Sequence, residues 1–174
     1  ELPDLLARCE SRLSELGGGA GIEALLEKEQ RSEASYRQLA TELSVQRKKA
    51  AKTLSQKVTV SMQSLAMQGG KFVVDFIARS EPSVHGLEQV VFAVAGHPGV
   101  APGAIDKVAS GGELSRIGLA LQVVMSKVAR VPTLIFDEVD AGIGGGVAEV
   151  VGKLLRELGA LHQVMCVTHL PQVA

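Results

Sequence analysis

The stretch from Ile22 to Met67 contains neither glycine nor proline, and it constrains the fold more than any other feature of the sequence. Its apolar residues recur at steps of three, four and seven, which is the spacing of a single stripe along a helix. They are Ile22, Leu25, Leu26, Tyr36, Leu39, Ala40, Leu43, Ala50, Leu54, Val58 and Leu65. A helix of this length would extend about 70 Å. Because its apolar stripe is thin, it needs a partner helix, and the sequence predicts a coiled-coil arm whose register is interrupted at Glu29, Glu33 and Arg47.

Glycines bound this stretch on both sides. A short helical pattern over residues 2–16 ends at the glycine-rich run 17–21, and Gly69-Gly70 follows the long stretch. We therefore divide the chain into an arm, residues 1–68 with a glycine break at 17–21, and a second unit, residues 69–174. Two possibilities stay open for residues 2–16, which either continue the arm or lie beyond an elbow at the break.

After Gly70 the hydrophobic period changes from that of a helix to that of strands. In chain order, the pattern predicts strand 72–79, turn 82–86, strand 89–95, loop 96–103, helix 114–128, strand 133–136, helix 147–158 and strand 163–167. We expect the last two strands to be buried. Because they alternate with helices through short connections, the fold class is α/β, with a parallel, doubly wound sheet and flanking helices in the last third.

Composition limits the partners that this chain can have. The net charge is −1, so any contact with nucleic acid must come from a local patch. Cys9 and Cys166 are too few for a disulfide framework or a metal site, and we expect two reduced thiols in a cytosolic protein. No apolar run reaches the roughly 18 residues of a membrane span, and we expect the polar, charged residues at the start of this sequence not to be a signal peptide. Because the chain starts at Glu1 rather than Met, we expect a piece of a longer protein.

The strand predicted at 133–136 delivers two acidic residues at its carboxyl end, Asp137 and Glu138. Ligand sites of parallel sheets lie at that end. Asp137 suits Mg²⁺, which keeps part of its water shell and needs few protein ligands. Glu138 would then lie close to a terminal phosphate, where it could orient and deprotonate the attacking water. Taken alone, an apolar strand that ends in Asp-Glu has an equally good structural explanation.

Two further motifs stand in a fixed order around this one. Ser110-Gly111-Gly112-Glu113 directly precedes a predicted helix, where Ser110 can cap the helix and the glycines expose backbone N–H groups to an anion. His169 follows the last predicted strand, where it could contact a γ-phosphate. Taken singly, Ser110-Gly111-Gly112-Glu113 is explained by a capped helix, and His169 by a structural histidine. All three motifs in this order and at this spacing favour a nucleotide site.

One part of such a site is missing. The sequence contains no G-x-x-x-x-G-K-[ST] phosphate-binding loop, and Gly69-Gly70-Lys71, the nearest segment, precedes a strand instead of linking a strand to a helix. The β- and γ-phosphates therefore have no cradle here. We expect this chain alone to be inactive as an ATPase.

The three motifs resemble the signature motif, Walker B and H-loop of the ABC ATPases, and a coiled coil placed before the signature motif resembles the SMC-like branch of that superfamily. The flanking residues 107–116, 135–143 and 167–174 are most similar to those of the branch that acts in bacterial repair of DNA double-strand breaks. The resemblance implies the C-terminal half of an ABC-type ATPase head. It also implies ATP and Mg²⁺ as cofactors. As partners it implies an N-terminal Walker A lobe of the same protein, a second copy of the head and DNA, in the cytoplasm at the nucleoid.

The resemblance also implies a role for each site residue. Ser110, Gly111 and Gly112, with Glu113 in the same motif, would contact the γ-phosphate across a head dimer. Asp137 would serve Mg²⁺, Glu138 the water and His169 the γ-phosphate. Asp140 to Gly144 would form the D-loop at the interface, although Gly144 stands where many ABC proteins carry aspartate.

Two alternatives to a repair ATPase remain at this level. One is a DNA tether or clamp in which ATP mainly gates head closure, and the other is an SMC-type chromosome organiser. A basic, acid-free stretch near the head end of the arm is equally well explained by DNA binding or by a solvated helix face; it comprises Arg47, Lys48, Lys49, Lys52 and Lys57. If it binds DNA, replacing Lys48, Lys49 and Lys52 with glutamate should weaken binding and flatten its salt dependence.

Overall fold

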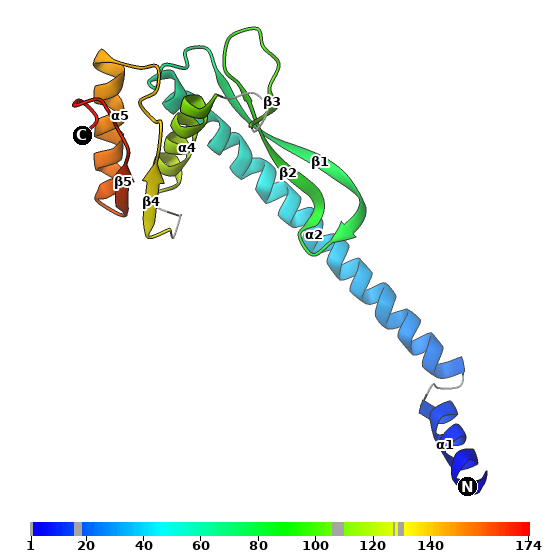
Figure 1. The fold of residues 1–174 in the computed structure, drawn as a ribbon. Helices are drawn as coiled ribbons and strands as arrows, with labels where there is room; N and C mark the ends of the chain where they lie inside the picture. The colour runs from blue at the N-terminus through cyan, green and yellow to red at the C-terminus, as the bar shows by residue number, and fades with distance from the viewer. Residues whose placement is uncertain (1, 16–18, 106–109, 127, 129–130) are drawn as a thin grey trace.

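The computed structural model describes residues 2–15, 19–105, 110–126, 128 and 131–174 of the 174-residue chain. In chain order, the elements are α1 (Leu2–Glu15), α2 (Gly19–Gln63), β1 (Lys71–Ser83), β2 (Gly86–Ala95), β3 (Gly103–Ala104), α4 (Gly111–Met125), β4 (Thr133–Phe136), α5 (Gly145–Gly159) and β5 (Gln163–Cys166). Figure 1 shows that α1 and the first half of α2 project away from the remaining elements, which gather around the C-terminal half of α2. The two termini therefore lie at opposite ends of the molecule.

The arm is built on α2, a single helix of 45 residues. Its first turn includes residues 19–21, so the predicted glycine break is narrower than 17–21, and Gly17 and Gly18 lie outside the described residues. Several leucines of its predicted stripe are exposed, among them Leu25 at 66% and Leu39 at 62%. These side chains have no partner helix within the described part of the chain. No helix of the described residues is long and apolar enough to cross a membrane.

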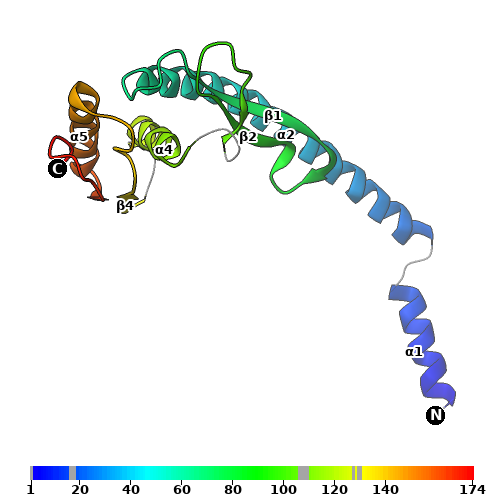
Figure 2. The same cartoon turned by 45° about the horizontal axis from the view of Figure 1, so that its top comes forward.

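A long antiparallel hairpin lies along α2 (Figure 2). Strands β1 and β2 extend the predicted strands, and Pro82 belongs to β1 rather than to the turn. At the hairpin tip the Tyr36 hydroxyl donates to the Ser83 carbonyl at 3.0 Å and accepts from the Ser83 N–H at 3.2 Å. Nearer the head, Lys48 forms an ion pair with Glu88 at 2.7 Å. The hairpin is therefore attached to the arm over much of its length.

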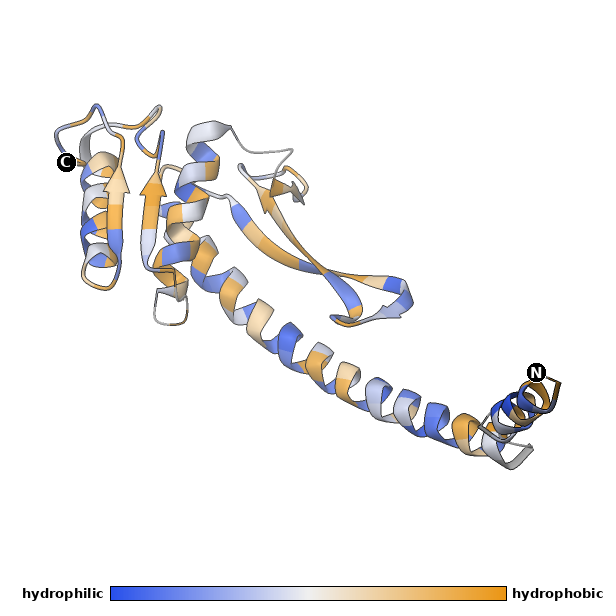
Figure 3. Ribbon diagram, turned by 60° about the horizontal axis from the view of Figure 1, so that its bottom comes forward, coloured by the Kyte–Doolittle hydropathy of each residue, from blue (hydrophilic) through white to orange (hydrophobic). Residues whose placement is uncertain are grey.

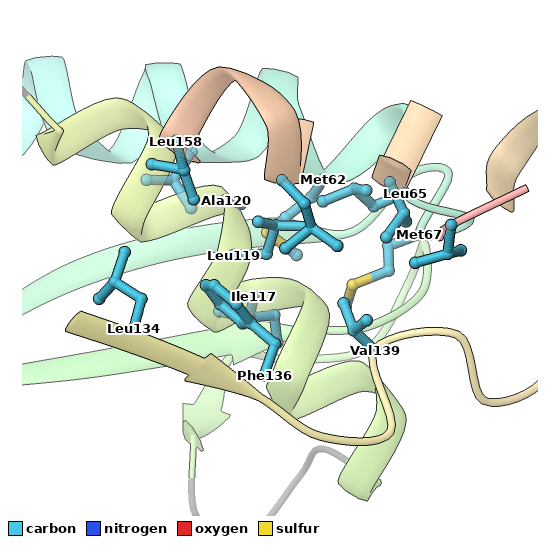
Figure 4. Close-up of a cluster of buried hydrophobic side chains, with 14 of the residues drawn as sticks. Met62, Leu65, Met67, Ile117, Leu119, Ala120, Leu134, Phe136, Val139 and Leu158 are labelled. Carbon is cyan, nitrogen blue, oxygen red and sulfur yellow. The ribbon is translucent and has the colours of Figure 1, made fainter. Parts of the chain in front are cut away.

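The hydrophobic core joins the end of the arm to the last third of the chain (Figure 4). Met62 at the end of α2, together with Leu65 and Met67 just after the helix, packs in the same cluster as residues from α4, β4 and α5. Figure 4 shows Ile117, Leu119, Phe136, Val139 and Leu158 around them. The α2 terminus is thus part of the core of the head. The division of the chain at residue 68 stays a prediction, because its two sides share this cluster.

Strands β4 and β5 pair in parallel with Phe136 opposite Cys166, as the sequence predicts. The core side chains Leu134 and Phe136 lie on the face that the helices cover. The opposite face is bare and apolar, because Ile135, Met165 and Val167 are exposed at 69%, 47% and 63%. Figure 3 colours both strands mainly hydrophobic. The prediction that these strands are buried is wrong for this face, because within the described residues no second layer covers it.

Candidate functional site

The signature segment, residues 110–113, forms the N-terminus of α4 as a capping box. Ser110 has an extended backbone, and its side chain accepts from the Glu113 N–H at 3.4 Å. In return, the Ser110 N–H donates to Oε2 of Glu113 at 2.9 Å. The prediction that Ser110 caps this helix is confirmed. The pKa of Glu113 is lowered mainly by the hydrogen bond from the Ser110 backbone, which outweighs the opposing effect of burial.

The start of α4 is fixed against the acidic loop, residues 137–144, by contacts one turn into the helix. The Ser115 hydroxyl donates to the Asp137 carbonyl at 2.5 Å. The buried guanidinium of Arg116 donates through Nη1 to the Ala141 carbonyl at 2.8 Å. Burial lowers the pKa of Arg116, opposed by the charge of Glu113. The signature segment and the acidic loop of one chain therefore form a single hydrogen-bonded unit.

The two glycines of the signature segment allow this close approach. A Cβ on Gly111 would collide with the Glu138 carboxylate. A Cβ on Gly112 would lie 2.9 Å from the Ala141 Cβ, which is closer than real side chains pack. A side chain at Gly112 would thus push α4 away from the acidic loop, whereas one at Gly111 would displace the end of the exposed Glu138 side chain.

The acidic pair lies exposed beyond β4. The Glu138 N–H donates to Oδ1 of Asp137 at 2.9 Å. Glu138 itself has φ of 55°, a left-handed conformation that costs a non-glycine residue on the order of 1–2 kcal/mol. The surrounding contacts hold this strained backbone and turn the carboxylate toward the signature segment. A strained residue of this kind is typical of a functional site.

The histidine loop, residues 167–170, lies next to the acidic loop because β4 and β5 are parallel neighbours. The Val167 N–H donates to the Phe136 carbonyl at 2.9 Å, which continues the ladder beyond β5. One oxygen of Asp140, Oδ2, then accepts from the Thr168 hydroxyl at 2.5 Å and from the His169 N–H at 3.0 Å. Nδ1 of His169 lies 3.2 Å from the same oxygen. Asp140 therefore connects the two loops.

Asp140 is 2% exposed, and it remains a charged acceptor. Burial raises the pKa of Asp140, but the hydrogen bonds from Thr168 and His169 together outweigh that effect, so the net pKa is lowered. A carboxyl whose pKa is lowered on folding stabilises the folded state above its ordinary pKa, and this contribution is lost as the pH falls through the lowered value.

All of the predicted site residues lie at this one edge of the parallel sheet. The Glu138 carboxylate faces Gly111, and Asp140 lies against His169. Sequence reasoning missed the anchoring residues Ser115 and Arg116, and it missed Thr168 as well. The signal for Ser115 and Arg116 was their place on α4 just after the signature segment, whereas nothing in the sequence distinguished Thr168 from an ordinary strand residue.

The acidic loop also fits the predicted cation. The described residues contain no group of three or more His, Cys, Asp or Glu that could hold a metal by themselves. Mg²⁺ does not need such a group, because it keeps several waters and binds one or two carboxylates together with substrate phosphates. An exposed Asp137 at the end of β4 matches that requirement.

Comparisons with known proteins identify the fold and the family. No family model matches the chain. Its structure is similar to an Smc head domain with an extended coiled coil from Pyrococcus furiosus, with a TM-score of 0.52, 19% identity, and 98% of this chain and 44% of that chain covered. It is also similar to an Smc head domain with a coiled coil and joint from Pyrococcus yayanosii, with a TM-score of 0.51, 20% identity, and 91% and 29% covered. The fold and the site together define part of an ABC-type head of the SMC-like class, preceded by a long arm helix.

Sequence relatives identify the branch. The chain is 48% identical over 153 residues to the DNA repair protein RecN of Haemophilus influenzae, covering 87% of this chain and 27% of the relative. It is 49% identical over 138 residues to the DNA repair protein RecN of Vibrio cholerae, covering 78% and 24%. The chain belongs to the RecN family. It spans about a quarter of the length of these relatives.

Proposed function

We propose that this chain is the C-terminal lobe of an ATPase head whose full-length protein acts in recombinational repair of DNA double-strand breaks. The observation that carries the proposal is the meeting of three motifs at one sheet edge, where hydrogen bonds connect the acidic loop to α4, which begins at the signature segment, and to the histidine loop. The names of the RecN relatives support a repair role. Because their identity exceeds that of the Smc structures, we favour this role over chromosome organisation.

In the proposed site each residue has one task. Asp137 would hold Mg²⁺, which when bound neutralises charge on the phosphates. Glu138 would take a proton from the attacking water. The exposed ring of His169 would contact the γ-phosphate. The signature segment would serve nucleotide held by a second head, with the partial positive charge of the α4 N-terminus directed at the γ-phosphate.

The bare face of the parallel sheet supports a missing lobe. Parallel sheets are normally covered on both faces, and an exposed apolar patch of this kind is typical of an interaction site. We propose that a lobe carrying the Walker A loop, contributed by the same full-length protein, covers Ile135, Met165 and Val167. Head dimerisation around ATP then completes the composite site, and the assembled protein acts at the nucleoid.

The first test of this proposal is reconstitution. Purified chain 1–174 is expected to release phosphate from ATP at the background rate, because it has no cradle for the phosphates. The full-length protein, or the chain combined with a separately produced Walker A lobe, is expected to hydrolyse ATP measurably faster than that background rate. Turnover by the chain alone would contradict the composite site, and so would a full-length protein that neither binds nor hydrolyses ATP.

The structure divides the basic stretch that the sequence marks for DNA binding. Arg47 donates to the His85 carbonyl at 2.7 Å, and Lys48 pairs with Glu88, so both attach the hairpin to the arm. Lys49, Lys52 and Lys57 are exposed. Reversal of Lys48 would therefore disturb the hairpin as well as any DNA contact. We propose that the three exposed lysines supply the contact with DNA phosphates.

Replacing Lys49, Lys52 and Lys57 with glutamate in the full-length protein is expected to weaken DNA binding. The slope of log K against log salt should fall in magnitude by about 2–3, because each lost phosphate contact removes close to one released counterion. Fluorescence anisotropy over a salt series measures both quantities. Reversal of Lys28 and Lys71, exposed cations outside the stretch, is the matched control. An unchanged salt slope in the triple variant would remove this stretch from the DNA interface.

A further inference from the structure

The contacts of Asp140 differ from those expected of a residue that touches nucleotide across a dimer interface. Its side chain is almost completely buried, and its oxygen Oδ2 accepts two hydrogen bonds from the histidine loop. Oδ2 accepts hydrogen bonds from the Thr168 hydroxyl and the His169 N–H, and Nδ1 of His169 lies 3.2 Å from the same oxygen. Of these groups, only the His169 ring is largely exposed, at 72%.

We propose that Asp140 is a positioning residue that fixes the backbone and the ring of His169 and thereby presents Nε2 to the γ-phosphate. The inference rests on the function proposed above, and it adds a residue to the machinery of the same site. Because Asp140 holds Nδ1, Nε2 lies on the opposite side of the ring, turned away from the carboxylate.

The need for such a residue follows from the exposure of the ring. An exposed histidine samples several staggered rotamers and two ring orientations, and only a small fraction of these would place Nε2 productively. A buried carboxylate that accepts from the His169 N–H and lies 3.2 Å from Nδ1 removes most of this freedom before nucleotide binds. The negative charge of the carboxylate beside Nδ1 also favours the tautomer that carries its proton on Nδ1, whereas an unrestrained neutral imidazole favours a proton on Nε2.

Thr168 has a separate part in this arrangement. Its hydroxyl donates to Asp140 and accepts from the Leu170 N–H at 3.1 Å. The hydroxyl therefore shapes the turn that carries His169 and also orients the carboxylate. Serine at this position keeps the hydroxyl, whereas alanine removes it.

The test uses four variants of the full-length protein, namely Asp140→Ala, Asp140→Asn, Thr168→Ala and Thr168→Ser. Asp140→Ala is expected to lower kcat for ATP about 10- to 100-fold with less than about a threefold change in KM, which is the size of effect usual for residues that orient a functional histidine. Thr168→Ala should lower kcat about tenfold. Thr168→Ser should retain turnover close to that of the parent. Asp140→Asn keeps an oxygen acceptor, so its kcat should lie between that of the parent and that of Asp140→Ala.

A second measurement does not depend on turnover. Nitrogen-15 NMR of the histidine rings at about pH 8, above the ordinary pKa of histidine, reports which ring nitrogen carries the proton, and the signal of His169 is assigned by its loss in His169→Gln. The parent without nucleotide should show His169 protonated on Nδ1, and Asp140→Ala should shift it to the Nε2 form. Asp75→Asn, an exposed aspartate on β1, is the control and should change neither kcat nor the spectrum.

The two readouts separate this inference from the proposed function. If the parent shows the Nδ1 form and Asp140→Ala loses it, the positioning contact exists even in a protein without ATP turnover. If His169 has the same tautomer in the parent and in Asp140→Ala, the inference is overturned. It is also overturned if Thr168→Ser loses as much kcat as Thr168→Ala, or if kcat of a folded Asp140→Asn or Asp140→Ala variant equals that of the parent.

Discussion

Replacing Glu138 with glutamine is expected to slow ATP turnover by the full-length protein about 100- to 10,000-fold and to prolong the lifetime of ATP-bound head dimers. Glutamine keeps the length of the side chain but removes the base that would accept a proton from the water. The Glu138 N–H that donates to Asp137 is retained, so the path of the acidic loop should not change. Phosphate release measures turnover, and analytical ultracentrifugation with ATP measures dimer lifetime.

Glutamine in place of Glu149, an exposed acid on α5, is the matched control, and it should change neither quantity. If both turnover and dimer lifetime are unaltered in the Glu138 variant, Glu138 is not the base and the proposed mechanism fails.

The same variant distinguishes a repair ATPase from a DNA clamp in which ATP only controls head closure. A clamp would retain DNA at the parent level when hydrolysis is blocked, whereas an ATPase that uses its cycle to act on DNA would lose that action.

Replacing Met62 with alanine is expected to lower the free energy of unfolding by about 2–5 kcal/mol. Met62 has no exposed surface and lies in the cluster that α2 shares with α4, β4 and α5. Truncation leaves a cavity where arm and head meet, so the cost includes lost contacts as well as lost burial. Urea denaturation followed by circular dichroism measures the change, and the position of the midpoint gives the stability difference.

Alanine in place of Val60 is the comparison within the same helix. Val60 lies close to Met62 in the sequence but is 71% exposed, so its replacement should change the free energy of unfolding by less than about 0.5 kcal/mol. Equal effects at the two positions would mean that the end of α2 is not part of the core of the head. The arm would then be connected to the head mainly through the hairpin.

The sequence by itself determined most of the local structure. Strand β4 was predicted with its observed bounds, because its four apolar or β-branched residues stand between a proline and an acidic pair. Ser110 and Glu113 were recognisable at the start of a helix, because a capping box depends only on residues three apart. The three motifs in their order resembled those of the ABC ATPases, and the long helical stretch before them resembled the SMC-like branch. Each element and motif taken singly is encoded within a few neighbouring residues.

The tertiary structure decided how these local parts meet. Asp140 is buried against Thr168 and His169 because β4 and β5 pair in parallel. No local sequence pattern predicts which side chain of the acidic loop turns inward. The inclusion of Met62 in the core depends on where α2 crosses α4. The bare face that includes Ile135 escaped prediction, because a strand with apolar residues on both sides is predicted to be buried even where no second layer covers it within the described residues. Contacts between distant residues depend on register and packing, which periodicity along the chain does not specify.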